Sequence, residues 1–295
     1  MESESEWNLP NADQIKLIAC DVDGTLLDAN NKFHKRNHRA LQYLRKRYPE
    51  LPIVLATGRQ RSSVNSIREP LELDVFPCIH LNGCVIYNKG EILSQVGLSK
   101  ELVYSIFSDV KEYETTAILL YDHNKVYLLK NDFESGSIKF AQDAGEDIDL
   151  AKPVDTILEQ VISNKLPVTK LAIYERNPER FNEIRMQLLK DNQKEYTLTQ
   201  SMSFVLEVIP SSVNKATGLT NILTKVYPNI HPNEVLSFGD AQNDACMFDI
   251  TGYSVAICNG MPAAIKAAKY ISRLPNHEGA VGEVLERIYR IPPNH

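Results

Sequence analysis

The sequence predicts an α/β protein in which a doubly wound parallel sheet is interrupted by an inserted α+β domain. Near both ends of the chain, short apolar runs alternate with helical patterns, which is typical of a parallel sheet covered by helices on both faces. Between about residue 86 and residue 210 the apolar runs come in closely spaced pairs instead, which indicates hairpins. The chain has 295 residues, a comfortable length for two cores.

The N-terminal part is expected to supply three strands that alternate with helices, after a loose polar tail up to about residue 13. The expected strands are short and apolar: 15–20, 53–56 and 78–81. The helical patterns cover 34–47, which is followed by two prolines, and 62–67, which is stopped by Pro70. Each strand ends in a polar, Gly-containing turn. Ligands bind at the carboxyl ends of parallel strands, so these turns are candidate sites.

The middle of the chain is expected to form the inserted domain. One hairpin pairs 116–121 with 125–130 across Asp122-His123-Asn124, and a second pairs 196–200 with 204–209. A strand at 168–174 and an amphipathic helix at 178–190 lie between them.

The alternating pattern of strands and helices resumes near Pro210. Helices are expected at 215–226, 245–250, 262–268 and 281–289, and strands at 234–238, 254–257 and 270–271. Both ends of the chain then build one discontinuous domain, residues 1–86 and 210–295, and residues 87–209 form the second.

Charge and composition exclude several classes of function. The formal net charge of -6 disfavours nucleic acid as an obligate partner, because a field of that sign repels phosphate backbones. No apolar run approaches the ~20 residues that span a bilayer, and the acidic start MESESEWNLPN is no signal peptide. The five cysteines match no zinc pattern and are expected to be reduced. We therefore expect a cytoplasmic protein without membrane or nucleic-acid partners.

Acidic residues follow two of the expected core strands. Asp21 and Asp23 lie in the turn after the first strand, where two carboxylates repel each other unless a cation lies between them. Oxygen-rich acidic sites suit Mg²⁺. Asp240 follows a later strand and can supply a third carboxylate. Taken alone, the Asp21 and Asp23 pair is better explained as an ordinary turn, and the Asp240 motif as an ordinary helix start.

Several other polar groups lie at strand ends or helix starts. Thr57 offers a hydroxyl and Gly58 frees backbone N–H groups, which together can hold an anion. The amide of Asn243 can donate to a phosphate oxygen. Lys215 opens an expected helix and has no distinctive context by itself.

Taken together, these motifs resemble the haloacid dehalogenase superfamily, and within it the Cof-type phosphatases with an α+β cap. The resemblance rests on DVDGTLL at 21–27, ATGR at 56–59, LNG at 81–83, IPSSVNK at 209–215 and GDAQND at 239–244. The motifs follow the family's order from about residue 15 to residue 290. Two departures are Ala216 after the motif lysine and Gly279-Ala280-Val281 in a late loop.

The resemblance implies a Rossmann-like catalytic core, an inserted cap and specific roles for the motif residues. Asp21 resembles the nucleophile that forms an aspartyl phosphate, and Asp23 resembles the general acid and base. The metal site would use Asp21, Asp23 through its main-chain carbonyl, and Asp240, with Asp244 in the outer shell. The expected substrate and phosphate contacts are Thr57, Gly58, Arg59, Asn82, Lys215 and Asn243.

The implied function is a Mg²⁺-dependent phosphatase of a small phosphorylated metabolite, a sugar phosphate or a phosphorylated cofactor. A phosphomutase of the same fold remains an alternative, because the motifs do not show whether water reaches the intermediate. A non-catalytic phosphate-binding module is the other alternative, although such proteins usually lose one of the acidic residues. The cap is expected to select the substrate, and the protein to be a monomer or weak homodimer.

Overall fold

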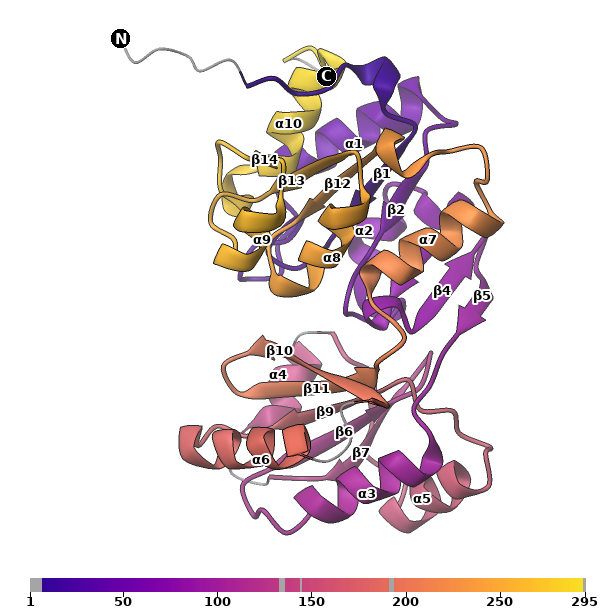
Figure 1. The fold of residues 1–295 in the computed structure, drawn as a ribbon, viewed down its shortest axis with the longest axis vertical. Helices are drawn as coiled ribbons and strands as arrows, with labels where there is room; N and C mark the ends of the chain where they lie inside the picture. The colour runs from indigo at the N-terminus through magenta and orange to yellow at the C-terminus, as the bar shows by residue number, and fades with distance from the viewer. Residues whose placement is uncertain (1–6, 133–135, 144, 191–193, 294–295) are drawn as a thin grey trace.

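The computed structural model describes residues 7–132, 136–143, 145–190 and 194–293. Its elements form two lobes stacked along the long axis, joined by chain segments near residues 97 and 210 (Figure 1). One lobe holds the first and the last of the described elements together with a parallel sheet, and the other lobe holds the inserted sheet. This arrangement confirms the predicted α/β fold with an α+β insertion.

The parallel sheet is the center of the first lobe. Its strand order is β14-β13-β12-β1-β2, and every neighbouring pair is parallel. The strands are β1 (Leu17–Cys20), β2 (Ile53–Leu55), β12 (Val235–Gly239), β13 (Tyr253–Ala256) and β14 (Tyr270–Ile271). Strands from the two ends of the chain are therefore neighbours, since β1 lies between β2 and β12.

Helices cover both faces of this sheet because side chains alternate along each strand. Ile18 and Cys20 of β1 pack in the cluster that includes α1 (Lys35–Arg47) and α10 (Ala280–Tyr289). Leu17 and Ala19 pack in the opposite cluster. The helices of that second face are α7 (Lys215–Lys225), α8 (Gln242–Ile250) and α9 (Pro262–Ala267).

The third expected strand, 78–81, does not extend the parallel sheet as predicted. β3 (Cys78–His80) meets β2 only through a parallel bridge between Ala56 and Ile79. It pairs instead with an antiparallel hairpin that the sequence did not predict, β4 (Val85–Asn88) and β5 (Glu91–Gln95). The predicted boundary after residue 86 falls within β4. The division into two domains stays a prediction.

Short helical turns connect these strands. The expected helix at 62–67 consists of η2 (Ser62–Val64) and α2 (Asn65–Arg68). The remaining 3₁₀ turns lie before or between core elements: η1 (Ala12–Gln14), η3 (Leu73–Val75), η4 (Leu81–Gly83), η5 (Pro232–Glu234) and η6 (Asn276–Glu278).

The inserted sheet has the order β10-β11-β9-β6-β7-β8, and both predicted hairpins are present. Its strands are β6 (Ala117–Tyr121), β7 (Val126–Lys130), β8 (Ile148–Asp149), β9 (Lys170–Tyr174), β10 (Tyr196–Met202) and β11 (Val205–Pro210). Its helices are α3 (Lys100–Val110), α4 (Ser137–Asp143), α5 (Val154–Ile162) and α6 (Pro178–Lys190). Only α6 was predicted from the sequence; α3, α4 and α5 were not.

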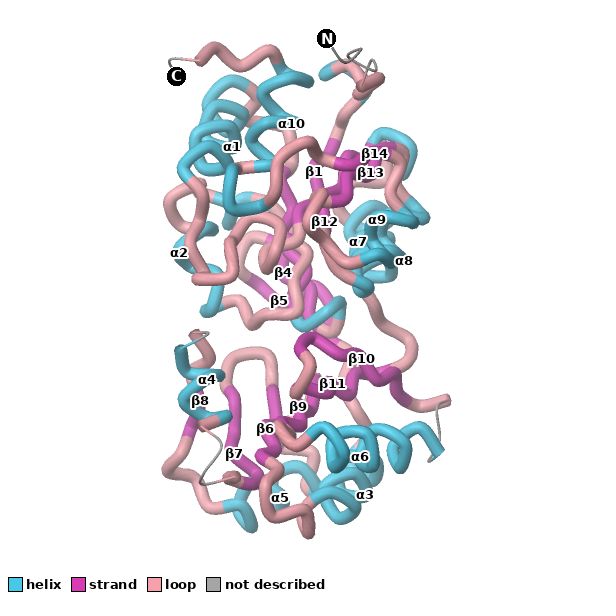
Figure 2. Tube along the Cα trace, turned by 90° about the vertical axis from the view of Figure 1, so that its left-hand side faces the viewer, coloured by secondary structure: helices cyan, strands magenta, loops and turns pink. Residues whose placement is uncertain are grey.

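The inserted sheet turns its two faces to different surroundings. Leu171 and Ile173 of β9 pack in the cluster formed with α3, α5 and α6, which lie on the side away from the other lobe (Figures 1 and 2). Ala172 and Tyr174 belong to the cluster shared with the first lobe. By the same alternation, Lys170 lies on the face toward the first lobe. This face, which we call the cap face, closes over the carboxyl ends of the core strands.

The segment before β1 is more ordered than the loose tail that was predicted. The ring of Trp7 lies beneath the guanidinium groups of Arg273 and Arg287, at 5.0 and 5.3 Å from its centroid. Leu9 and Trp7 both pack against the hydrophobic core. Stacking of aromatic rings on guanidinium groups stabilises such a segment. The predicted loose tail is therefore wrong from residue 7 onward, and residues 1–6 lie outside the described residues.

All five cysteines are free thiols, as expected. Within the described part of the chain, no helix has the length and apolar character needed to cross a membrane.

Candidate active site

Three carboxylates gather at the carboxyl ends of two adjacent core strands. Cys20 of β1 pairs with Phe238 of β12, so the residues that follow these strands emerge side by side. Asp21 and Asp240 follow the strands directly, and Asp244 lies in the first turn of α8. One oxygen of each carboxylate lies within 4.8 Å of the others. Parallel strands thus bring together residues that are about 220 positions apart in the sequence.

Lys215 neutralises part of this negative charge. Its Nζ lies 2.5 Å from Oδ1 of Asp21 and 2.7 Å from Oδ1 of Asp244, and its side chain is buried. Asn214 caps α7 by accepting the N–H of Thr217, so the first helical residue, Lys215, is held in place. Burial lowers the pKa of Lys215, but the two carboxylates outweigh burial and keep the pKa above its ordinary value.

One ammonium group does not balance three clustered carboxylates. Burial raises the pKa of Asp21 well above its ordinary value. The charge of Lys215 lowers this pKa, and the charges of Asp244 and Asp240 raise it further. Burial, followed by the charge of Asp244, raises the pKa of Asp240 to about 6. One carboxylate oxygen of Asp21 lies within 4.8 Å of one of Asp240. Two carboxyl groups this close require a shared proton or a cation between them.

The chemistry of the donor set fits a magnesium ion, which takes carboxylate oxygens. Both carboxylate oxygens of Asp244 already have hydrogen-bond partners. Its Oδ2 accepts the backbone N–H groups of Asp240 and Ala241, both at 3.0 Å, and its Oδ1 contacts Lys215. Asp21 and Asp240 are therefore the carboxylates best able to hold the ion directly. Thr25 fixes Asp240 by donating to its Oδ1 at 3.0 Å.

Gly24 leaves room for the carboxylate of Asp240. A Cβ atom at this position would lie 2.2 Å from Oδ2 of Asp240, and Gly24 also has a positive φ of 72°. Both the close approach and the left-handed backbone require glycine. The turn after β1 is thus shaped around the carboxylate of Asp240.

Asp23 lies apart from the carboxylate cluster and is exposed. Its carboxylate accepts two hydrogen bonds from Nε of Arg59, at 2.9 and 2.8 Å, and one from Nη2 at 2.5 Å. Arg59 also donates to the side chain of Asn31. The side chain of Asp23 is thus directed at the motif arginine, and a role as acid requires it to turn toward the leaving oxygen.

The remaining predicted phosphate contacts lie beside the cluster. Thr57 is buried after β2, and its Oγ1 accepts the backbone N–H of Arg59 at 3.1 Å. A Cβ at Gly58 would lie 3.2 Å from the side-chain amide atoms of Asn82. Asn243 donates from Nδ2 to Oδ1 of Asn82 at 3.0 Å. The two amides therefore form a hydrogen-bonded pair next to Gly58.

Asn82 occupies an unusual backbone conformation. Its φ is 57°, and the preceding Leu81 has a φ of 50°. Left-handed backbone is uncommon in residues other than glycine, and asparagine tolerates it best. The strained turn places the Asn82 side chain between the two lobes, where it is buried.

Four polar residues near the site were not predicted from the sequence. Thr25 lies inside the first quoted motif, and a hydroxyl next to a Gly turn was an available signal. Lys170, Glu207 and Glu146 come from the inserted domain. These three residues had no motif to mark them, because only the alternation of the strands and the packing of the two lobes bring them to the site.

Glu146 is a half-buried carboxyl group near this junction. Burial raises its pKa from 4.5 to about 6. The positive charges of Lys170 and Arg59 lower the pKa, and the negative charges of Glu207 and Asp23 raise it. Among the described residues, no donor reaches its buried Oε2. The neighbouring Gly145 carbonyl accepts a hydrogen bond from Ser63 of the core at 3.1 Å. The loop that carries Glu146 therefore rests on the core.

We expect Glu146→Gln to stabilise the protein relative to wild type at neutral pH but not in acid. The fold favours the neutral form of Glu146, so its contribution is present below pH 4.5 and is lost as the pH rises through about 6. The difference in unfolding free energy between variant and wild type should rise by about 1–2 kcal/mol from about pH 4.5 to about pH 7.5. Urea unfolding at both pH values measures it.

The matched control is Glu179→Gln, which removes an exposed carboxylate at the start of α6. Because this carboxylate is exposed to water, the variant controls for the exchange of a surface Glu for Gln under the same two conditions. An equal change in both variants would mean that the environment of Glu146 is not special.

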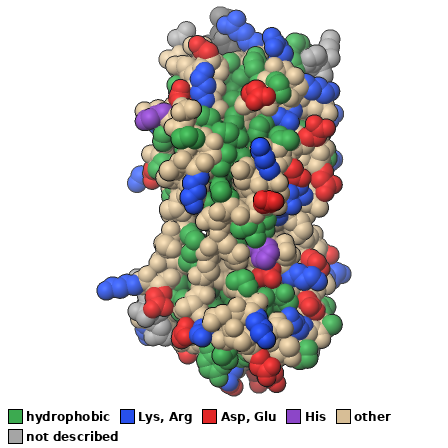
Figure 3. Space-filling view, turned by 90° about the vertical axis from the view of Figure 1, so that its right-hand side faces the viewer, with side chains coloured by type: hydrophobic (Ala, Val, Ile, Leu, Met, Phe, Trp, Pro, Cys, Tyr) green, Lys and Arg blue, Asp and Glu red, His purple; other side chains and the backbone are tan. Residues whose placement is uncertain are grey.

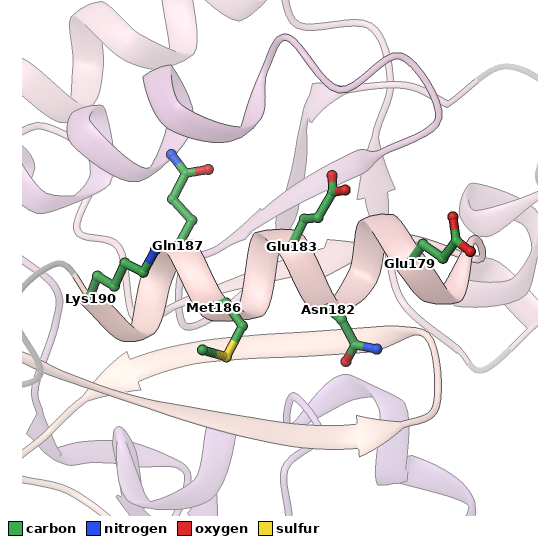
Figure 4. A pocket seen from close by; sticks show the side chains of 6 residues that line it. All are labelled: Glu179, Asn182, Glu183, Met186, Gln187 and Lys190. Carbon is green, nitrogen blue, oxygen red and sulfur yellow. The ribbon is translucent and has the colours of Figure 1, made fainter.

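Two surface hollows lie away from the carboxylate cluster. One runs along the outer side of α6 and is lined by Glu179, Asn182, Glu183, Met186, Gln187 and Lys190 (Figure 4). The second lies beside α3 and β10. In the space-filling view, Lys, Arg, Asp and Glu side chains are interspersed over both lobes on the face shown (Figure 3). None of these features competes with the strand-end cluster as a candidate site.

Comparisons with known proteins agree with this geometry. The family model of haloacid dehalogenase-like hydrolases matches residues 18–285. An uncharacterized hydrolase of Schizosaccharomyces pombe is 48% identical over 97% of this chain and 95% of its own. A crystal structure of a haloacid dehalogenase-like hydrolase from Bacteroides thetaiotaomicron superposes with a TM-score of 0.79 at 26% identity, covering 93% of this chain and 99% of that one.

A third relative has a named substrate. The 5-amino-6-(5-phospho-D-ribitylamino)uracil phosphatase of Bacillus subtilis is 22% identical, over 93% of this chain and 98% of its own.

Proposed function

The chain belongs to the haloacid dehalogenase-like hydrolases, and from this membership we propose that it is a magnesium-dependent phosphatase of a small phosphorylated metabolite. One observation carries the proposal. The buried carboxylate of Asp21 lies 2.5 Å from Nζ of Lys215 and within 4.8 Å of a carboxylate oxygen of Asp240, at the carboxyl end of β1. A nucleophile, a fixed cation and a metal-binding carboxylate thus surround one position.

In the proposed reaction Asp21 attacks phosphorus as the bond to the leaving oxygen breaks. Asp23 turns from Arg59, takes up a proton from water and gives this proton to that oxygen. Water then attacks the aspartyl phosphate, Asp23 takes a proton from this water, and inorganic phosphate and the free Asp21 carboxylate result.

Charge on the phosphoryl group is stabilised by groups whose positions are already fixed. Lys215 supplies a buried positive charge, and the amides of Asn82 and Asn243 supply N–H donors. A magnesium ion held by Asp21 and Asp240 would neutralise part of the substrate's charge.

The substrate class is proposed as a sugar phosphate or a phosphorylated cofactor. The Bacillus relative, which acts on a phosphorylated ribityl compound, supports including ribityl phosphates in this class. The partner is therefore a small molecule that fits between the carboxylate cluster and the cap face.

We expect phosphate release from at least one compound in a panel of sugar, nucleotide and cofactor monophosphates, only with Mg²⁺. A chelator should remove activity and added Mg²⁺ should restore it, because Asp21 and Asp240 repel each other and the substrate without a cation. Colorimetric phosphate detection measures both. Turnover that resists the chelator would remove the metal from the proposal. Activity that needs an added bisphosphate would indicate a phosphomutase instead.

A further inference from the structure

Glu207 is a buried carboxylate on the cap face. Along β11, Val205 and Ile209 pack in the cluster shared with the first lobe, and Glu207 lies between them on the same face. Only 8% of the residue is exposed. A carboxylate in such a position needs partners that hold its charge.

Its partners come from both lobes. Oε1 accepts a hydrogen bond from Nζ of Lys170, on β9 of the inserted sheet, at 2.8 Å. Oε2 accepts one from Nδ2 of Asn82, on the core, at 3.2 Å. Lys170 itself reaches the backbone carbonyl of Gly58 at 3.4 Å. The pair of charged residues on the cap face thus meets two of the predicted phosphate contacts.

A chain of hydrogen bonds continues from Glu207 into the core. Asn82 donates to Glu207 and accepts from Asn243 at 3.0 Å. Each amide nitrogen has two N–H groups, and among the described residues one of them on each amide donates to a side chain. The second N–H of each amide remains in a fixed plane and is available to a phosphoryl oxygen. The acceptor on the cap face therefore sets the direction of both amides.

We propose that Glu207 is a positioning residue for phosphate binding, which acts through Asn82 and, beyond it, Asn243. The proposal rests on the proposed function insofar as the amides bind a phosphoryl group. It adds that this part of the site is complete only when the cap face is seated on the core.

Lys170 fits a supporting role in this arrangement. Its ammonium group lies 4.1 Å from the ring centroid of Tyr121, a second buried neighbour on the cap face. Burial lowers the pKa of Lys170, but the charges of Glu207 and Glu146 keep the pKa above its ordinary value. A charged Lys170 fixes one oxygen of Glu207, so the other is presented to Asn82 in one orientation.

The test is a double-mutant cycle between Glu207→Ala and Asn82→Ala, read by two measurements. Calorimetric binding of inorganic phosphate in the presence of Mg²⁺ reports on the site without turnover. Hydrolysis of p-nitrophenyl phosphate gives kcat and KM separately. We expect Glu207→Ala to weaken phosphate binding on the order of 10-fold, because one hydrogen bond to a charged group orients the donor. In the Asn82→Ala background the same change should have no further effect.

Two further variants separate positioning from loss of structure. Glu207→Gln keeps an oxygen acceptor for Asn82 and should recover part of the binding. Glu175→Ala removes another buried carboxylate of the inserted domain, whose side chain accepts from Thr115, Thr116 and the backbone of Asn177. Phosphate binding should be unchanged in Glu175→Ala.

Two results would overturn the role of Glu207. One is that Glu207→Ala weakens phosphate binding by the same factor in the wild-type background and in the Asn82→Ala background. The other is that Glu175→Ala weakens phosphate binding as much as Glu207→Ala does. Wild-type protein that binds phosphate but hydrolyses no ester would overturn the proposed function alone, since the binding cycle still tests Glu207. Wild-type protein that binds no phosphate would overturn both.

Discussion

Asp21→Asn is expected to abolish phosphatase turnover, by about ten-thousand-fold or more, while the protein stays folded. An amide is not a nucleophile toward phosphorus, and no other carboxylate of the cluster is placed to replace Asp21. Asp244 is held by Lys215 and by two backbone N–H groups. Asp240 is fixed by Thr25. Steady-state hydrolysis of the best substrate from the metabolite panel measures the loss.

The stability of this variant distinguishes lost chemistry from lost structure. The pKa of Asp21 is raised in the fold, so the ionised form is less stable there than in the unfolded chain. The contribution of the neutral form is lost as the pH rises through this raised pKa, and a neutral side chain of the same shape removes the repulsion with Asp244 and Asp240 at any pH. Thermal unfolding without Mg²⁺ should give a Tm equal to or above that of wild type. Activity close to wild type would rule out Asp21 as the nucleophile.

Lys215→Met should lose both activity and stability. Lys215 is the buried ion-pair partner of Asp21 and Asp244, and its removal leaves these carboxylates uncompensated. Breaking a buried pair on one side costs about 3–5 kcal/mol. The loss of transition-state charge stabilisation should lower kcat about a thousand-fold. Denaturant unfolding and steady-state kinetics measure the two effects.

Magnesium should offset part of the lost stability in Lys215→Met, because a cation at Asp21 relieves the same repulsion. The matched control is Lys225→Met, at the exposed C-terminal end of the same helix, α7. That variant should keep wild-type activity and lose less than about 1 kcal/mol of stability. Equal destabilisation of the two variants would mean that Lys215 contributes no more than an ordinary surface lysine.

The parallel core could be predicted because local pattern and global fold agree there. The runs that became β1, β2, β12 and β13 are mostly apolar and almost entirely buried, as expected of strands that are covered on both faces. Each ends in a polar turn, so the motifs at Asp21 and Asp240 could be placed at one edge of the sheet before any coordinates were known.

The third strand shows where pattern alone fails. The apolar run at 78–81 resembles the other core strands, yet β3 turns into a hairpin with β4 and β5. The strained turn at Leu81 and Asn82 causes the chain to reverse there, and its positive φ values could not be predicted from the sequence. The same turn brings Asn82 to the junction of the two lobes.

The cap residues could not be predicted because their role depends on packing between segments distant in sequence. Lys170 and Glu207 are single charges within apolar strands, and each is 37 positions from the other. Only the pairing of β9 with β11, and the docking of the cap face on Gly58 and Asn82, shows what they contact. A sequence pattern that alternates within one strand contains no information about this docking.

The central claim, that Asp21 receives the phosphoryl group, is tested most directly by trapping. Enzyme in turnover with its best substrate would be quenched in acid and treated with borohydride, which reduces an aspartyl phosphate to homoserine, before peptide mass spectrometry. We expect homoserine in place of Asp21 and at no other aspartate. Rapid turnover without any such modification, or modification at Asp244 or Asp240 instead, would contradict it.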